Sequence, residues 1–253
     1  MNDFAAPEES SKFILMANSA ATIWGERLSY LGIPAVTKTN CMRKIVFSGL
    51  LPLLLFSGIK SEGQEEFIEP PARFITRTSF NQLTGGIILL KARLDNFPDT
   101  LNFILDTGSS GISLDSLTVN YLNLKPVPTN RTIRGIAGIK NVSFLFDHTL
   151  HINGLTADSL DFHVNDYSIL TSVYGERIDG IIGFSLLNRY IVKIDYDSLK
   201  LDFFSRGTYR YPKGGYLFKP ILNSLPVMNL RVRDAINTNS RFLFDIGAGL
   251  CMM

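Results

Sequence analysis

The chain has 253 residues, 45% of them hydrophobic, and a formal net charge of +2 at pH 7. That length suits one large domain or two small ones, with an ample apolar core. No block of lysine and arginine stands out, so the charge pattern gives no indication of a nucleic-acid partner. The two cysteines, Cys41 and Cys251, argue against a disulfide framework and against a cysteine-based metal site.

The segment 42–63, MRKIVFSGLLPLLLFSGIKSEG, has the three parts of a secretory signal peptide. Two cations follow the methionine, an apolar run covers 45–59, and small residues precede the expected cleavage point. The apolar run is short for a bilayer span and Pro52 interrupts it, which makes a membrane anchor the weaker alternative. We therefore expect export, cleavage near Gln64, and a periplasmic or extracellular protein of the bacterial cell envelope.

Residues 1–41 precede this signal peptide, although such peptides stand at the extreme N-terminus. Met42 therefore has the character of the true start. The leader shows no clear hydrophobic period. It is either upstream sequence included by a wrong start assignment or a disordered extension, and we set it aside when predicting the fold.

From Gln64 onward, short apolar segments alternate with turn residues. Leu117, Tyr121 and Leu124 have helical spacing and predict one short helix, with Asp115 or Ser116 as its cap. A second helix, after the strand at 179–183, would be at most short. The expected strands are 72–77, 85–94, 101–106, a pair within 141–164 around Asn153-Gly154, and a pair within 189–204 around Asp197-Ser198. The pattern predicts an all-β fold with little helix.

An internal repeat links two distant parts of the chain. FILDTGSS, which contains Asp106, aligns without gaps with FLFDIGAG, which contains Asp245, at an offset of 139 residues. The preceding strands align at an offset of 138, for example Ala92 with Leu230, so the second loop is one residue longer. Two copies this far apart indicate two lobes, each supplying one acid to a shared site.

Two neighbouring carboxylates can perform acid–base chemistry on a water molecule. They cannot easily both ionise, so they share one proton, and one acts as base while the other acts as acid. Gly108 allows close approach of the backbone, and we expect the hydroxyls of Thr107 and Ser109 to orient the carboxylate. This chemistry requires neither a metal ion nor another cofactor.

Asp106-Thr107-Gly108-Ser109 after an apolar strand resembles the signature of the aspartic peptidases, both pepsin-like and retropepsin-like. The resemblance extends to DGIIGFSLL at 179–187, which is similar to the family's strand that passes the catalytic loop. It implies an acid-protease barrel lobe at 64–208, the beginning of a second pseudo-symmetric lobe at 209–253, and catalytic Asp106 and Asp245.

The Gly-rich stretch TIRGIAGIKNVSF, at 132–144, is similar to the family's mobile flap. The resemblance implies that Gly135, Ile136, Ala137 and Gly138 contact a peptide or protein substrate. It also implies a supporting role for Gly247, the second-motif counterpart of Gly108.

The second motif departs from the family pattern in two ways. Ile246 replaces the threonine, and neither a second flap nor a second strand of the IIG type follows before Met253. We expect a missing C-terminal segment or a second copy of the chain to complete the fold. Residues 64–253 alone are expected to be inactive, or active only as a homodimer that uses Asp106 from each chain.

The remaining candidate residues have structural explanations. His148 and His151 lie three apart and face opposite sides of a strand, so we expect no metal site. Asp179 is expected to be a turn or surface acid. Two functions stay open: an exported aspartic endopeptidase, or a catalytically inactive relative that binds extended peptides.

Overall fold

The computed structural model describes residues 12–15, 23–25, 69–135, 138–218, 220–222, 225–232 and 238–249. The chain divides into two units, Met1–Arg27 with Pro70–Met253 and Leu28–Glu69. All elements described below belong to the first unit. The expected signal peptide at 42–63 lies outside the described residues, as does most of the leader at 1–41.

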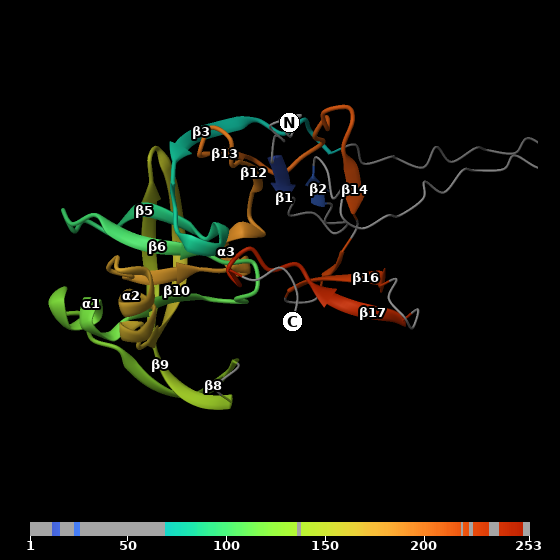
Figure 1. Cartoon of the computed structure of the whole chain (residues 1–253). Coiled ribbons are helices and arrows are strands. Elements are labelled where there is room, and N and C mark those ends of the chain that lie inside the picture. Colours follow the sequence, from blue (N-terminus) through green and yellow to red (C-terminus); the bar gives the residue numbers. More distant parts are fainter. Residues whose placement is uncertain are drawn as a thin grey trace, which may run out of the picture. The chain divides into compact units, whose positions relative to one another are not determined.

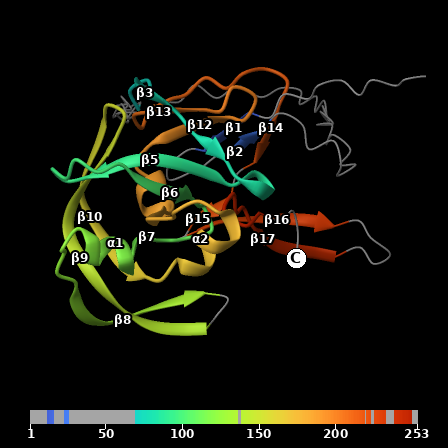
Figure 2. The same cartoon turned by 60° about the vertical axis from the view of Figure 1, so that its left-hand side comes forward.

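A closed barrel forms the centre of the first lobe (Figures 1 and 2). β5 pairs with both β6 and β9, so six of the strands in one sheet join into a ring. The prediction of an all-β fold is confirmed. In pairing order, the eight strands of this sheet are β4 (Asn81–Gln82), β5 (Ile88–Leu94), β6 (Leu101–Leu105), β11 (Gly180–Ile182), β7 (Ile112–Asp115), β10 (Leu155–Asn165), β9 (Gly138–Ile152) and β8 (Val127–Gly135).

Two further sheets accompany the barrel. The six-stranded sheet consists, in pairing order, of β14 (Tyr216–Phe218), β2 (Ile23–Gly25), β1 (Lys12–Leu15), β12 (Ile191–Asp195), β13 (Lys200–Phe204) and β3 (Phe74–Ser79). The three-stranded sheet consists of β15 (Ile221–Leu222), β16 (Pro226–Val232) and β17 (Thr238–Leu243). β1 and β2 fall within the leader that the sequence analysis set aside. The domain boundaries at 41, 63 and 208 stay predictions.

Helices are few and short among the described residues: η1 (Thr84–Gly86), α1 (Ser116–Tyr121), α2 (Ser168–Tyr174) and α3 (Phe184–Leu187). The predicted cap of α1 is confirmed, because the Asp115 carboxylate accepts a hydrogen bond of 3.0 Å from the backbone N–H of Leu117. Within the described part of the chain, no helix has the length and apolar character that a membrane span requires.

The first half of β5 is buried on both of its faces, which explains the continuous apolar sequence there, whereas Lys91 and Arg93 in the second half are exposed. Ile88 and Leu90 point into the main core inside the barrel. Ile87 and Leu89 point the other way, into a second buried cluster that includes Ile104 of β6. β5 and β6 are therefore fixed from both sides, and β6 leads directly into the first aspartate motif.

Candidate active site

The two aspartate motifs follow two hairpins of identical register. In the first hairpin Ala92 pairs with Leu101, and in the second Leu230 pairs with Ser240. The offsets are again 138 on one strand and 139 on the other, so the repeat predicted from the sequence is confirmed in three dimensions. Figure 1 shows the second hairpin, β16–β17, in red.

The two motifs lie against each other through their glycines and their acids. A Cβ atom added to Gly108 would lie under 3.0 Å from both carboxylate oxygens of Asp245. A Cβ added to Gly247 would lie under 3.0 Å from Cγ and Oδ1 of Asp106. Each motif therefore needs glycine where the acid of the other motif packs, and the structure brings Asp106 and Asp245 together.

Backbone N–H groups hold the two carboxylates in equivalent ways. Gly108 donates to Oδ1 of Asp106 at 2.7 Å, and Gly247 donates to Oδ1 of Asp245 at 2.8 Å. Ser109 adds a second backbone hydrogen bond to Asp106. These charge-assisted bonds fix each carboxylate within its own turn.

The environment favours the protonated form of Asp106. Burial, the charge of Asp245 and the hydrogen bond between the two carboxyl groups raise the pKa of Asp106 from 3.8 to about 7. The backbone hydrogen bonds from Gly108 and Ser109 oppose this shift. The site therefore retains a proton on Asp106 at pH values where an ordinary aspartate is ionised.

The hydroxyl of Thr107 joins the two motifs rather than orienting its own carboxylate. It donates to the carbonyl of Phe244 at 2.6 Å and accepts from the backbone N–H of Ile246 at 3.1 Å. Ile246 has no hydroxyl, so the reciprocal pair of bonds cannot form, and its side chain packs against the main core instead. The link between the motifs is therefore one-sided, because position 246 carries isoleucine.

Ser109 also differs from expectation in what its side chain does. Its hydroxyl contacts the carbonyl of Gly111 at 3.3 Å, within the same loop. The orientation of the Asp106 carboxylate therefore depends on backbone N–H groups and not on the neighbouring hydroxyls.

Strand β11 supports the first motif, because it pairs with β6 on one side and with β7 on the other. The N–H of Asp106 donates to the carbonyl of Ile182 at 3.0 Å, and the N–H of Phe184 donates to the carbonyl of Ser109 at 2.7 Å. Gly183 lies where a Cβ would meet the carbonyl oxygens of Ser109 and Gly111. The IIG stretch thus passes the loop that follows Asp106, as the resemblance implied.

The predicted flap is the hairpin of β8 and β9, in which Gly135 pairs with Gly138. Side-chain space is open at both glycines, and Gly138 has φ of +106°. Ile136 and Ala137 lie outside the described residues. Lower on the hairpin, the guanidinium of Arg131 lies 5.1 Å from the ring centroid of Phe144.

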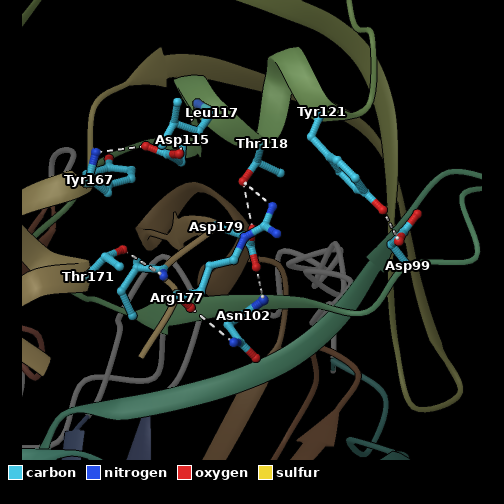
Figure 3. A network of polar contacts seen from close by, with 11 residues as sticks. Asp99, Asn102, Asp115, Leu117, Thr118, Tyr121, Tyr167, Thr171, Arg177 and Asp179 are labelled. Atoms are coloured by element: carbon cyan, nitrogen blue, oxygen red, sulfur yellow. Dashed lines mark hydrogen bonds and ion pairs between the residues drawn. The ribbon is translucent and has the colours of Figure 1, made fainter. Parts of the chain in front are cut away.

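Asp179 is buried, so the prediction of a turn or surface acid is wrong (Figure 3). Its carboxylate accepts hydrogen bonds from the backbone of Asn102 and from the hydroxyl of Thr118, and it forms an ion pair of 2.7 Å with Arg177. This group joins the start of β6, helix α1 and the segment before β11. It stabilises the strands next to the loop that follows Asp106.

Sequence reasoning missed helix α2 and its connection to α1. The N–H of Ser168 donates to the carboxylate of Asp166, and Gly175 ends the helix with φ of +68°. These two signals, together with apolar residues four apart, would have predicted the helix. Asp115 accepts from the N–H of Tyr167 at 2.8 Å and so joins the starts of α1 and α2.

Within the described residues, no group of three or more histidine, cysteine or acidic side chains is arranged to hold a metal ion.

Similar solved structures include a retropepsin-like aspartic protease from Rickettsia conorii, with 22% identity, a TM-score of 0.39, and coverage of 53% of this chain and 95% of that one. An aspartic proteinase from Irpex lacteus has 16% identity and a TM-score of 0.36, with coverage of 53% and 47%. A search of curated proteins found no match. A model of the aspartyl protease family matches residues 90–186. Over this segment, which contains Asp106 and the β8–β9 hairpin, the chain is similar to the aspartyl protease family.

Proposed function

We propose that this protein is an aspartic-type endopeptidase that uses Asp106 and Asp245 of the same chain. The observation that carries the proposal is the reciprocal packing of the two motifs, in which each glycine accommodates the acid of the other. The pKa of Asp106, raised to about 7 by burial and by Asp245, agrees with a shared proton. The family match over 90–186 supports peptidase chemistry in general.

The two carboxyl groups divide the work of hydrolysis between them. The ionised carboxylate removes a proton from a water molecule placed between the pair, and the water oxygen attacks the peptide carbonyl. The protonated carboxyl donates its proton to the carbonyl oxygen, which gives a neutral gem-diol. The carboxyl that took the proton from water then donates it to the leaving nitrogen, while the other carboxylate removes a proton from one hydroxyl of the gem-diol. The C–N bond breaks, the carboxylic acid and the amine leave, and the pair returns to its starting state.

The flap hairpin supplies a surface for an extended peptide. β8 pairs with β9 alone among the described strands, so the other edge of β8 presents backbone N–H and C=O groups. A substrate strand binds such an edge through backbone hydrogen bonds, independently of its sequence. This supports an endopeptidase that accepts peptide or protein substrates.

The absent hydroxyl of Ile246 favours a second candidate, a peptide-binding relative without catalytic activity. A one-sided link between the motifs holds the acids less firmly than a reciprocal one. A third arrangement is a homodimeric peptidase that uses Asp106 from each chain. Proximity of Asp106 and Asp245 within one chain supports the intrachain pair over this arrangement.

One set of variants distinguishes the three candidates. Asp106→Asn abolishes cleavage of a peptide library in both peptidase arrangements, whereas Asp245→Asn abolishes it only in the intrachain arrangement. Asp99→Asn is the matched control. Asp99 precedes β6, at the end of the strand away from the motif, and accepts a hydrogen bond from the hydroxyl of Tyr121. A chain that binds a hydroxyethylene peptide isostere but cleaves nothing across pH 3–8 would establish the inactive binder instead.

Export is a further part of the proposal. It depends on the signal-peptide pattern at 42–63 and predicts a mature protein in the periplasm or outside the cell. Expression in a bacterium and mass spectrometry of the N-terminus test this. A mature terminus near Gln64 agrees with export, and a cytoplasmic chain that begins at Met1 contradicts it.

A further inference from the structure

The turn between β4 and β5 lies against the second aspartate motif. The turn is closed by two backbone hydrogen bonds, from Leu83 to the carbonyl of Ile87 at 2.8 Å and from Gly86 to the carbonyl of Leu83 at 3.1 Å. Gly85 and Gly86 within it have φ of +81° and +82°. Both positions therefore favour glycine for backbone reasons alone.

Only Gly85 of the two also lacks space for a side chain. A Cβ on Gly85 would lie 2.7 Å from the carbonyl oxygen of Gly249 and 2.9 Å from its Cα. A Cβ on Gly86 would meet nothing closer than the amide nitrogen of Gln82, at 3.9 Å. Gly85 thus contacts the backbone that follows Asp245, four residues beyond that acid.

The same turn is rigidly connected to the first motif. It leads into β5, where Ile88 pairs with Leu105, the residue directly before Asp106. The turn and Asp106 consequently belong to one hairpin, whose end next to them is buried on both faces. A contact between the turn and Gly249 therefore fixes the position of the second motif relative to the first.

The second motif requires such a contact because its own link is incomplete. Thr107 fixes Phe244 and the N–H of Ile246, which flank Asp245 closely. Ile246 cannot return these bonds, and the stretch that follows it needs another support. Gly85 is one such support, and Ile87 is a second. A Cβ placed on Gly249 would lie 3.7 Å from Cδ1 of Ile87, an ordinary contact distance.

We propose that Gly85 is a positioning residue, whose backbone turn holds Gly249 and thereby places Asp245 opposite Asp106. This inference rests on the proposed function, since it assigns the turn a role in the same catalytic pair. The turn compensates for the hydrogen bonds that Ile246 cannot make. The nearest atoms to a side chain at Gly85 all belong to the backbone of Gly249, so Gly85 acts through the backbone of the second motif.

The test compares Gly85→Ala with Gly86→Ala in the full chain. Both variants place alanine at nearly the same positive φ, so they share the backbone strain, and only Gly85→Ala displaces Gly249. The first readout is titration of the Asp106 carboxyl by ¹³C NMR, which does not depend on activity. We expect Gly85→Ala to lower the Asp106 pKa by at least about one unit because Asp245 moves away. Gly86→Ala should leave the titration where the unsubstituted chain has it.

The second readout is peptide cleavage. Misplacement of a catalytic group by about 1 Å reduces turnover on the order of 10²-fold, so Gly85→Ala should lower kcat by that factor while KM changes little. Equal effects of the two substitutions on titration and kcat would overturn the inference. If Asp106 of the unsubstituted chain titrates as an ordinary aspartate, the proposed function fails, and the inference fails with it.

A measurement without substitution covers the case in which Gly85→Ala does not fold. The α-protons of Gly85 and Gly249 should show a nuclear Overhauser effect in the unsubstituted chain, because the Cα of Gly249 lies only 2.9 Å from where a Cβ of residue 85 would be. If this effect is present, and if Gly86→Ala folds while Gly85→Ala does not, the inference is supported. Absence of the effect overturns it.

Discussion

Gly108 packs directly against the carboxylate of Asp245, leaving no room for even a methyl group between them. Gly247 has the same relationship to Asp106. The glycines of the two motifs are therefore a condition for bringing the acids together, and not only a feature of the turn conformation. Neither residue has a positive φ, so conformational freedom does not explain its identity.

The first prediction concerns Gly108→Ala. The added methyl must displace the Asp245 carboxylate, and we expect loss of kcat/KM on the order of 10²-fold. Gly111→Ala in the same loop is the graded control, since its Cβ would lie 3.3 Å from Nδ1 of His163, a smaller conflict. Steady-state kinetics and thermal unfolding of both variants measure the difference. Equal losses in the two variants would contradict the role assigned to Gly108.

The second prediction concerns the pH dependence of stability. The folded-state pKa of Asp106, raised to about 7, exceeds its ordinary value of 3.8, so the unfolded chain ionises first as the pH rises. The contribution of protonated Asp106 to the free energy of unfolding is complete below about pH 4 and is lost as the pH approaches 7. Asp106→Asn removes this loss, and each pH unit across the window corresponds to about 1.4 kcal/mol. The variant should therefore gain a few kcal/mol relative to the unsubstituted chain between pH 4 and pH 8.

Urea unfolding at several pH values measures this gain. Glu176→Gln is the control, because Glu176 is exposed and lies outside the aspartate pair. The pH dependence of the stability difference for Asp106→Asn is compared with that of this control. If the Asp106→Asn difference varies with pH no more than the control, Asp106 is not protonated near neutral pH in the folded chain.

Local patterns in the sequence predicted the hairpins and the α1 cap, and they showed the replacement of threonine by Ile246. Each of these depends on residues close in sequence or on a repeat visible within it. The burial of Asp179 could not be predicted in this way, because its partners Asn102 and Thr118 come from other elements. The contact of Gly85 with Gly249 is also long-range, and the sequence shows only a glycine pair there. Propensity and periodicity report on single elements, whereas these contacts arise from packing between elements.

The third prediction concerns Thr107, which is fully buried. Thr107→Val keeps the shape but leaves the carbonyl of Phe244 and the N–H of Ile246 without their partner, at a cost of about 1–3 kcal/mol. This destabilises the second motif locally, so hydrogen exchange at the Ile246 amide should accelerate about ten- to hundredfold. Thr107→Ser retains the hydroxyl and should exchange at close to the original rate. If valine and serine behave alike, the hydroxyl does not hold the motifs together.

The last prediction concerns the polar group around Asp179 in Figure 3. Asp179→Ala leaves the N–H of Asn102 and the hydroxyl of Thr118 without their acceptor in a buried position. Each such loss costs about 1–3 kcal/mol, and we expect the free energy of unfolding to fall accordingly. Arg177→Ala should cost much less, since the Arg177 side chain is 54% exposed and pairs at the edge of the group.

Chemical unfolding of both single variants and the double variant separates the contributions. The double variant should be about as unstable as Asp179→Ala alone, because the ion pair has already been lost. Asp179→Asn should be intermediate, since its amide oxygen replaces only one of the two acceptors. An Arg177→Ala variant less stable than Asp179→Ala would show that the ion pair dominates. The buried bonds from Asn102 and Thr118, which join β6 to α1, would then be secondary.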